Sequence, residues 1–223
     1  MDKEDEFILK SAFYFWDNLC EEEKTLLLEN VSEVHYKKGS NVHSADNDCI
    51  GVMIIKSGEL RTYILSEEGK EITLYRLNAG EVCILSASCL INNISFDVHI
   101  DAEIETDILL INSFIFSKLQ SQNIYVENFA LHTTVDKFSD VMWAMQQILF
   151  LSFDKRLASF LIDEAVKTNS DDIKLTHEQI AKYMGSAREV VTRMLNHFEN
   201  DGLVELYRGG VFIKDKQKLR KMI

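Results

Sequence analysis

The chain has 223 residues and is 46% apolar, enough for two modest domains that each close a core, so a disordered protein is excluded as the default. It has no run of roughly 18 apolar residues and no positive secretion-signal start, so we expect a cytoplasmic protein. The net charge is -12, but residues 155–223 carry 13 Lys+Arg against 10 Asp+Glu, whereas residues 1–154 carry 11 against 26, so only the C-terminal part suits a phosphate-bearing partner.

The segment from Val34 to about Ile111 has the pattern of an all-β sandwich or barrel. Regular glycines punctuate it, as expected of short strands joined by turns. Side chains alternate between the two faces in two runs, and the apolar-polar alternation of the second run predicts a strand with one buried and one solvent-exposed face. The glycines are Gly39, Gly51, Gly58, Gly69 and Gly80; the first run sets Leu60, Thr62 and Ile64 against Arg61, Tyr63 and Leu65, and the second sets Val98, Ile100, Ala102 and Ile104 against His99, Asp101, Glu103 and Glu105.

The segment from Ile124 to Leu149 predicts one long helix with an apolar seam. Its apolar residues follow an a/d heptad spacing that extends back through Asn128, a polar residue of the kind that sets register. Such a seam favours pairing with a second helix, although a long helix packed on its own β domain remains open. The dimer seam consists of Leu131, Val135, Phe138, Met142, Met145 and Leu149.

A helix-turn-helix is predicted after the helix that starts at Lys155 and the polar break at residues 168–172. Thr176 and Gln179 have the spacing of a capping box, Gly185 ends that helix, and Ser186 with Glu189 has the form of a second capping box. Two short helices joined by a tight turn containing glycine form this DNA-binding motif.

The second helix has one apolar face and one face suited to base reading. At about 100° per residue, Arg188, Glu189, Thr192 and Arg193 lie on the side opposite Val191 and Leu195. Arginine pairs with guanine, glutamate accepts from cytosine, and threonine meets a phosphate or a thymine methyl. An amphipathic helix with a merely solvated polar face, in which Glu189 serves only the cap, is the alternative.

A wing follows the second helix. Residues 203–206 and 211–213 read as a β-hairpin on a turn at Gly209 and Gly210, with Arg208 near the tip and positioned for phosphate. The predicted DNA-contacting residues are Thr176, Ser186, Arg188, Glu189, Thr192, Arg193 and Arg208.

The order of these elements, with the run from Gly185 to Arg193, resembles the Crp/Fnr family over nearly the whole chain. The resemblance implies an α+β fold with a cyclic-nucleotide-binding-like β-roll in residues 1–122, a dimerisation helix in 123–153 and a winged helix-turn-helix in 154–223. It also implies that Arg188, Glu189 and Arg193 read base edges, that a homodimer binds a two-fold symmetric operator, and that the regulator controls access of RNA polymerase.

The ligand site departs from the family pattern. Gly80-Glu81 matches the pair that holds the ribose in cyclic-nucleotide-binding members, but residues 92–97 have no arginine for the cyclic phosphate. A buried phosphate needs a cationic or multi-donor partner, so we predict that cyclic AMP is not the effector and that Glu81 is a turn residue. The predicted effector pocket consists of Gly80, Glu81, Val82, Cys83, Cys89 and Ser95.

No cofactor or metal is assigned from the sequence. Iron-sulfur members of the family have clustered N-terminal cysteines, whereas Cys20 stands alone, and the chain has no CxxC pair. Cys83 and Cys89 fit buried packing, redox thiols or ligands of a metal or haem, for which His35, His43 and His99 are further but weak candidates.

An enzyme is not expected, because the sequence has no P-loop, dinucleotide-binding glycine pattern, HExxH or nucleophile elbow. The alternative to a DNA-binding regulator is a ligand-binding signalling module that acts through protein partners without touching DNA.

Overall fold

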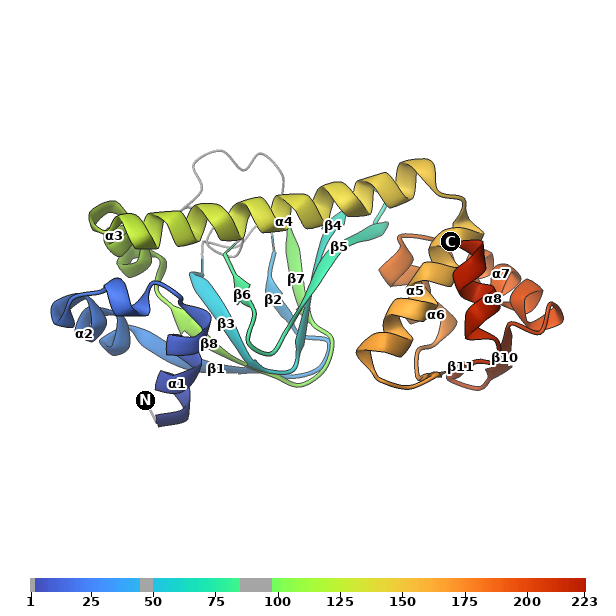
Figure 1. The fold of residues 1–223 in the computed structure, drawn as a ribbon, viewed down its shortest axis with the longest axis horizontal. Helices are drawn as coiled ribbons and strands as arrows, with labels where there is room; N and C mark the ends of the chain where they lie inside the picture. Colours follow the sequence, from blue (N-terminus) through green and yellow to red (C-terminus); the bar gives the residue numbers. More distant parts are fainter. Residues whose placement is uncertain (1–2, 45–49, 85–97) are drawn as a thin grey trace. The chain divides into compact units, whose positions relative to one another are not determined.

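The structure is a computed structural model that describes residues 3–44, 50–84 and 98–223 (Figure 1). Its contacts divide the chain into two compact units. The first unit consists of Met1–Ile64 and Leu74–Val141, and the second of Leu65–Thr73 and Met142–Ile223. Among the described residues, no helix is long and apolar enough to cross a membrane.

The first unit opens with helices that the sequence reading did not assign. An aromatic cluster holds them: the Phe13 ring stacks on Phe15 at 4.8 Å between centroids and meets the edge of Phe129 at 5.2 Å. These rings bury large apolar areas and pack the N-terminal segment against the long helix. The elements are α1 (Lys3–Ala12), η1 (Trp16–Asn18) and α2 (Glu21–Glu29).

A β-roll of two antiparallel sheets follows, as predicted. In the described residues the strands pair in the orders β1-β8-β3-β6 and β2-β7-β4-β5. The five predicted turn glycines all have positive φ, which explains their regular use at the strand ends. The strands are β1 (Val31–Tyr36), β2 (Asn41–His43), β3 (Val52–Ser57), β4 (Glu59–Leu65), β5 (Glu71–Asn78), β6 (Val82–Cys83), β7 (His99–Ala102) and β8 (Thr106–Ile111).

The first predicted alternating run forms β4, whereas the second forms β7 only as far as Ala102. Leu60, Ile100 and Ala102 are buried as expected, but Ile104 is 48% exposed because β7 already ends at Ala102 and the chain turns toward β8. The prediction that Ile104 belongs to the buried face is therefore wrong.

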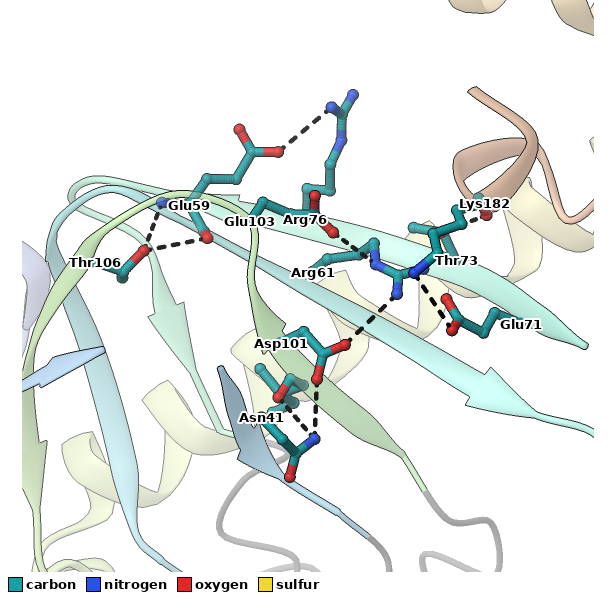
Figure 2. A network of polar contacts seen from close by, with 11 residues as sticks. Asn41, Glu59, Arg61, Glu71, Thr73, Arg76, Asp101, Glu103, Thr106 and Lys182 are labelled. Atoms are coloured by element: carbon teal, nitrogen blue, oxygen red, sulfur yellow. Dashed lines mark hydrogen bonds and ion pairs between the residues drawn. The ribbon is translucent and has the colours of Figure 1, made fainter. Parts of the chain in front are cut away.

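The opposite face of β4 holds a buried cation (Figure 2). Arg61 is 1% exposed, and its Nε lies 2.8 Å from Glu103 Oε1 while Nη2 lies 3.7 Å from Asp101 Oδ2. The Asn41 amide also donates to Asp101 at 2.9 Å, which ties β2 into the same network. Because buried charges require partners, the two carboxylates keep Arg61 inside the sheet.

The long helix α4 (Ile124–Phe150) follows α3 (Ser113–Gln122) and runs unbroken, as Figure 1 shows. It packs on the core of the first unit through Val126, Phe129 and Ala130. The heptad residues lie on a different side and are between 45% and 67% exposed. The seam is therefore not the face with which α4 contacts its own β-roll; its members are Leu131, Val135, Phe138, Met142, Met145 and Leu149.

The second unit has a separate apolar core formed by helices and a small sheet of order β10-β11-β9. Its helix α5 begins at Phe153, three residues after α4 ends at Phe150 and two residues before the start at Lys155 that the sequence predicted. The further elements are α5 (Phe153–Lys167), β9 (Asp172–Ile173), α6 (His177–Met184), α7 (Arg188–Asn200), β10 (Val204–Tyr207), β11 (Gly210–Ile213) and α8 (Lys216–Met222).

Candidate nucleic-acid interface

The first helix of the helix-turn-helix, α6, begins at the predicted capping box. Thr176 Oγ1 accepts from the Gln179 N–H at 3.2 Å, and Gln179 Oε1 accepts from the Thr176 N–H at 2.9 Å. The box satisfies amides that the first turn would otherwise leave without partners. Ile180, Ala181 and Met184 are buried, so this cap sets the entry of α6 onto the core.

The turn after α6 is built on Gly185, whose φ of +59° is left-handed. The Ser186 N–H donates to the Ala181 carbonyl at 2.9 Å and the Gly185 N–H donates to the Lys182 carbonyl at 3.3 Å. This is the Schellman arrangement, which satisfies the carbonyls at a helix end and redirects the chain.

The predicted capping role of Ser186 is wrong. The N-cap of α7 is Ala187, which makes no side-chain cap, and the helix begins at Arg188. Ser186 is engaged in closing α6 through its backbone, so the second helix starts one residue later than the sequence pattern indicated. Glu189 is then the second residue of α7, and it does not form a capping box with Ser186.

The second helix, α7, separates its faces as predicted. Val191, Leu195 and Phe198 are buried in the core of the second unit, whereas Arg188 and Arg193 are exposed. An open surface hollow lies over the polar face. It is lined by Arg188, Glu189, Thr192, Arg193 and Asn196. The four predicted base-reading residues of α7 therefore share one surface, whereas Thr176, Ser186 and Arg208, the other predicted DNA-contacting residues, do not line it.

The sequence did not predict one member of this surface, Asn196, or the residue His177 that contacts it through Thr192. Asn196 lies about 80° from Arg188 around α7 and so belongs to the polar face, which the helical period alone could have indicated. His177 is the first residue of α6, and its Nδ1 lies 2.9 Å from Thr192 Oγ1 on α7. No local pattern reveals that contact, because it joins two helices.

The wing forms with a small shift from the prediction. Tyr207 pairs with Gly210, so the two-residue turn is Arg208-Gly209, and Gly210 already belongs to β11. Arg208 lies exposed at the tip, as expected. The unpredicted β9 extends this sheet by pairing with β11, and the Tyr207 hydroxyl donates to Asp172 at its start.

Three further contacts of the second unit hold α6 in place. The Arg156 Nη2 donates to the carbonyl of Met184 at 2.7 Å, which connects α5 to the end of α6. Thr73 Oγ1 donates to the carbonyl of Lys182 at 3.2 Å, and Lys182 Nζ lies 3.7 Å from Glu71 Oε1, as Figure 2 shows. A carbonyl at a helix end attracts a cation, so Arg156 stabilises the turn.

The predicted effector pocket is described only in part, because Cys89 and Ser95 lie outside the described residues. Glu81 is a turn residue as predicted: its Oε2 accepts from the Asn78 N–H at 2.7 Å, and its Oε1 lies 3.7 Å from Lys137 Nζ. Val82 and Cys83 form β6 beside Gly80, and the Cys83 side chain is buried.

Two hydroxyl-bearing side chains lie buried in the described part of the roll, and Lys137 Nζ lies 4.9 Å from the ring centroid of one of them, Tyr75. Thr62 and Tyr75 are both buried, and a hydrogen bond from Thr62 acts on the Tyr75 hydroxyl. Burial, followed by the nearby Cys83 thiol, raises the pKa of Tyr75 well above its ordinary value, so the phenol is neutral. Within the same described part, no group of three His, Cys, Asp or Glu is placed to hold a metal ion.

Comparisons with known proteins agree with this architecture. A family model described as the Crp-like helix-turn-helix domain matches residues 155–222. A solved structure from Eubacterium rectale, described as a transcriptional regulator of the Crp/Fnr family, is 44% identical to this chain and has a TM-score of 0.91. The match spans 95% of this chain and 98% of the Eubacterium rectale chain.

Curated relatives are more distant. Electron transport regulator A of Shewanella oneidensis is 25% identical over 82% of this chain and 75% of its own length. The cAMP-activated global transcriptional regulator Vfr of Pseudomonas aeruginosa is 24% identical over 81% of this chain and 88% of its own length.

Proposed function

The chain belongs to the Crp/Fnr family of transcription regulators, and from this membership we propose that it is a homodimer that binds DNA sequence-specifically under control of its β-roll. The observation that carries the proposal is the division of α7. One face is buried in the core, and the other presents Arg188, Glu189 and Arg193 to solvent over an open hollow.

The chemistry of this face suits a major groove. A guanidinium donates bidentately to guanine O6 and N7, a carboxylate accepts from cytosine N4, and an amide such as that of Asn196 pairs with adenine N6 and N7. Arg208 at the wing tip and the N-terminus of α6 at Thr176 are suited to the phosphates on either side. Base contacts from α7 then specify the sequence, while the flanking contacts set the register.

The exposed seam of α4 supports pairing with a second copy of the chain. Six apolar side chains at heptad spacing form a continuous stripe, and water contact with such a stripe is unfavourable. Burying it against the same stripe of a partner generates two-fold symmetry. The two recognition helices then read half-sites about 34 Å apart, one turn of B-DNA, and the bound dimer controls the access of RNA polymerase.

Regulation follows from a population shift. A signal in the β-roll changes how the two α4 helices meet, and the break between Phe150 and Phe153 passes this change to the second unit. An effector acts only through different affinities for the two arrangements.

Cyclic AMP is not the proposed effector. The carboxylate of Glu81 is already engaged by Asn78 and lies close to Lys137, and residues 77–117 contain no Lys or Arg to meet a cyclic phosphate. The buried Tyr75 phenol is neutral and so adds no positive charge that could bind a phosphate.

Adding cyclic AMP is therefore expected to leave both operator affinity and thermal stability unchanged. Fluorescence anisotropy on a selected duplex and a thermal melt measure the two quantities, and Vfr, the cAMP-activated regulator of Pseudomonas aeruginosa, serves as the positive control. A tenfold gain in affinity for the duplex, or a clear rise in melting temperature, would contradict the exclusion.

Salt dependence tests DNA binding against a module that acts only through protein partners. DNA binding releases counterions, so the affinity for a selected duplex should fall at least a hundredfold between about 50 and 200 mM salt. Titrations of a random duplex at the same salt concentrations give the non-specific control. If the chain prefers no duplex, or if its affinity is flat across this range, the protein-partner alternative replaces the proposal.

A further inference from the structure

A histidine outside the recognition helix contacts the candidate base-reading surface. His177 Nδ1 lies 2.9 Å from Thr192 Oγ1, and both side chains are partly buried between α6 and α7. Either the ring nitrogen or the hydroxyl donates, depending on the tautomer. The contact is direct in both cases, so it restrains the side chain of Thr192.

The ring is neutral at pH 7. Burial, and after it the positive charge of Arg188, lower the pKa of His177 from its ordinary value of 6.5. A neutral imidazole has one donor and one acceptor nitrogen, so it forms this hydrogen bond without adding a charge to the surface.

The restraint matters because threonine is ambiguous on a helix. Its χ1 angle divides between two rotamers, since Oγ1 can also bond a carbonyl of the preceding turn. A change of χ1 exchanges the places of Oγ1 and the γ-methyl, so the rotamer decides which of the two groups lies on a given side of the helix. The bond to His177 holds Oγ1 toward α6, and because χ1 is then set, it also fixes where the γ-methyl of Thr192 lies.

We propose that His177 is a positioning residue that turns the γ-methyl of Thr192 toward the C5-methyl of a thymine in each half-site. The proposal rests on the proposed function, because it requires α7 to lie in a major groove. It assigns specificity to an apolar methyl contact set from the neighbouring helix, alongside the charged contacts of Arg188, Glu189 and Arg193.

Replacing single thymines by uracil in a selected duplex tests this directly, because uracil lacks only the C5-methyl group. Wild-type protein should lose affinity about threefold to fourfold at one position of each half-site, the effect of one methyl removed from contact. His177→Ala and Thr192→Ser should both bind the thymine and uracil duplexes equally. The double variant should behave like either single variant, because one contact is lost in all three.

Two matched variants separate positioning from a general structural effect. His177→Asn keeps a polar atom near the place of Nδ1 and should restore the discrimination between thymine and uracil. His197→Ala removes a histidine of α7 that pairs with Asp201 at 3.0 Å, and it should leave the discrimination at its wild-type value. Melting temperatures of all variants are measured in parallel.

Thr192→Ser removes only the γ-methyl. It keeps the hydroxyl that contacts His177, so it tests the methyl contact without removing the hydrogen bond between α6 and α7.

The outcomes are distinguishable. If wild-type protein selects a duplex but His177→Ala or Thr192→Ser still discriminates thymine from uracil, the inference is overturned and the proposed function stands. If wild-type protein selects a duplex and discriminates at no position, the methyl contact is absent and the inference again fails. If wild-type protein selects no duplex at all, both the proposed function and the inference fail.

Discussion

Phe138→Glu is expected to convert the proposed dimer into a monomer and to abolish high-affinity operator binding. Phe138 lies near the middle of the exposed seam and is 63% exposed in the single chain. In a two-fold dimer it meets the partner's seam, so the substitution removes two large apolar side chains and places two carboxylates in one apolar layer. A penalty of about 4 kcal/mol or more raises the dimer dissociation constant about a thousandfold.

DNA binding should fall with the dimer. Linking two half-site contacts raises overall affinity by about 10² to 10⁴, and a monomer loses that gain. Sedimentation equilibrium gives the mass, for which the monomer value is 25.7 kDa, and anisotropy gives the operator affinity.

Trp143→Glu is the matched control for the seam. Trp143 is a large apolar residue of the same helix that is 55% exposed, but it lies about 120° around α4 from Leu131. Its substitution should leave the protein dimeric. A dimer that persists in Phe138→Glu with unchanged operator affinity would refute the seam as the dimer interface.

Arg193→Ala is expected to reduce operator affinity about five- to 150-fold for each half-site while affecting random DNA much less. A bidentate arginine–guanine contact contributes about 1 to 3 kcal/mol of discrimination, and its loss relaxes the requirement at one base pair. Arg193 is exposed on the same hollow as Arg188 and Glu189. Competition titrations with single-base operator variants identify which position relaxes.

Arg208→Ala is the matched control for base reading. This arginine lies at the wing tip, away from α7, and is expected to contact phosphate. Its loss should weaken specific and random duplexes alike and reduce the slope of log affinity against log salt by about one for each chain, or about two for the dimer. Equal losses on both duplexes for Arg193→Ala would remove that residue from base reading.

The sequence predicted the elements whose signals are local. The capping box at Thr176, the left-handed Gly185 and the amphipathic period of α7 each depend on a few neighbouring residues, and the structure confirms all three. The fold class, with its β-roll, long helix and winged helix-turn-helix, is likewise confirmed by the structure and by the Crp/Fnr relative.

The misses depend on contacts between distant residues. The N-terminal helices are held by rings brought together from Phe13, Phe15 and Phe129, and β9 exists because it pairs with β11. Ser186 failed as a cap because the end of one helix and the start of the next compete for the same residue, and the closing of α6 prevails. The contact of His177 with Thr192 joins two helices and has no sequence signature.

The most direct test of the account is the footprint of the wild-type protein on a duplex selected from a randomised pool. We predict two chains on each duplex and two related half-sites that are protected from cleavage, with their centres about 34 Å apart on one face of the DNA. A single protected half-site occupied by one chain, or a pool from which no sequence is enriched, would contradict it.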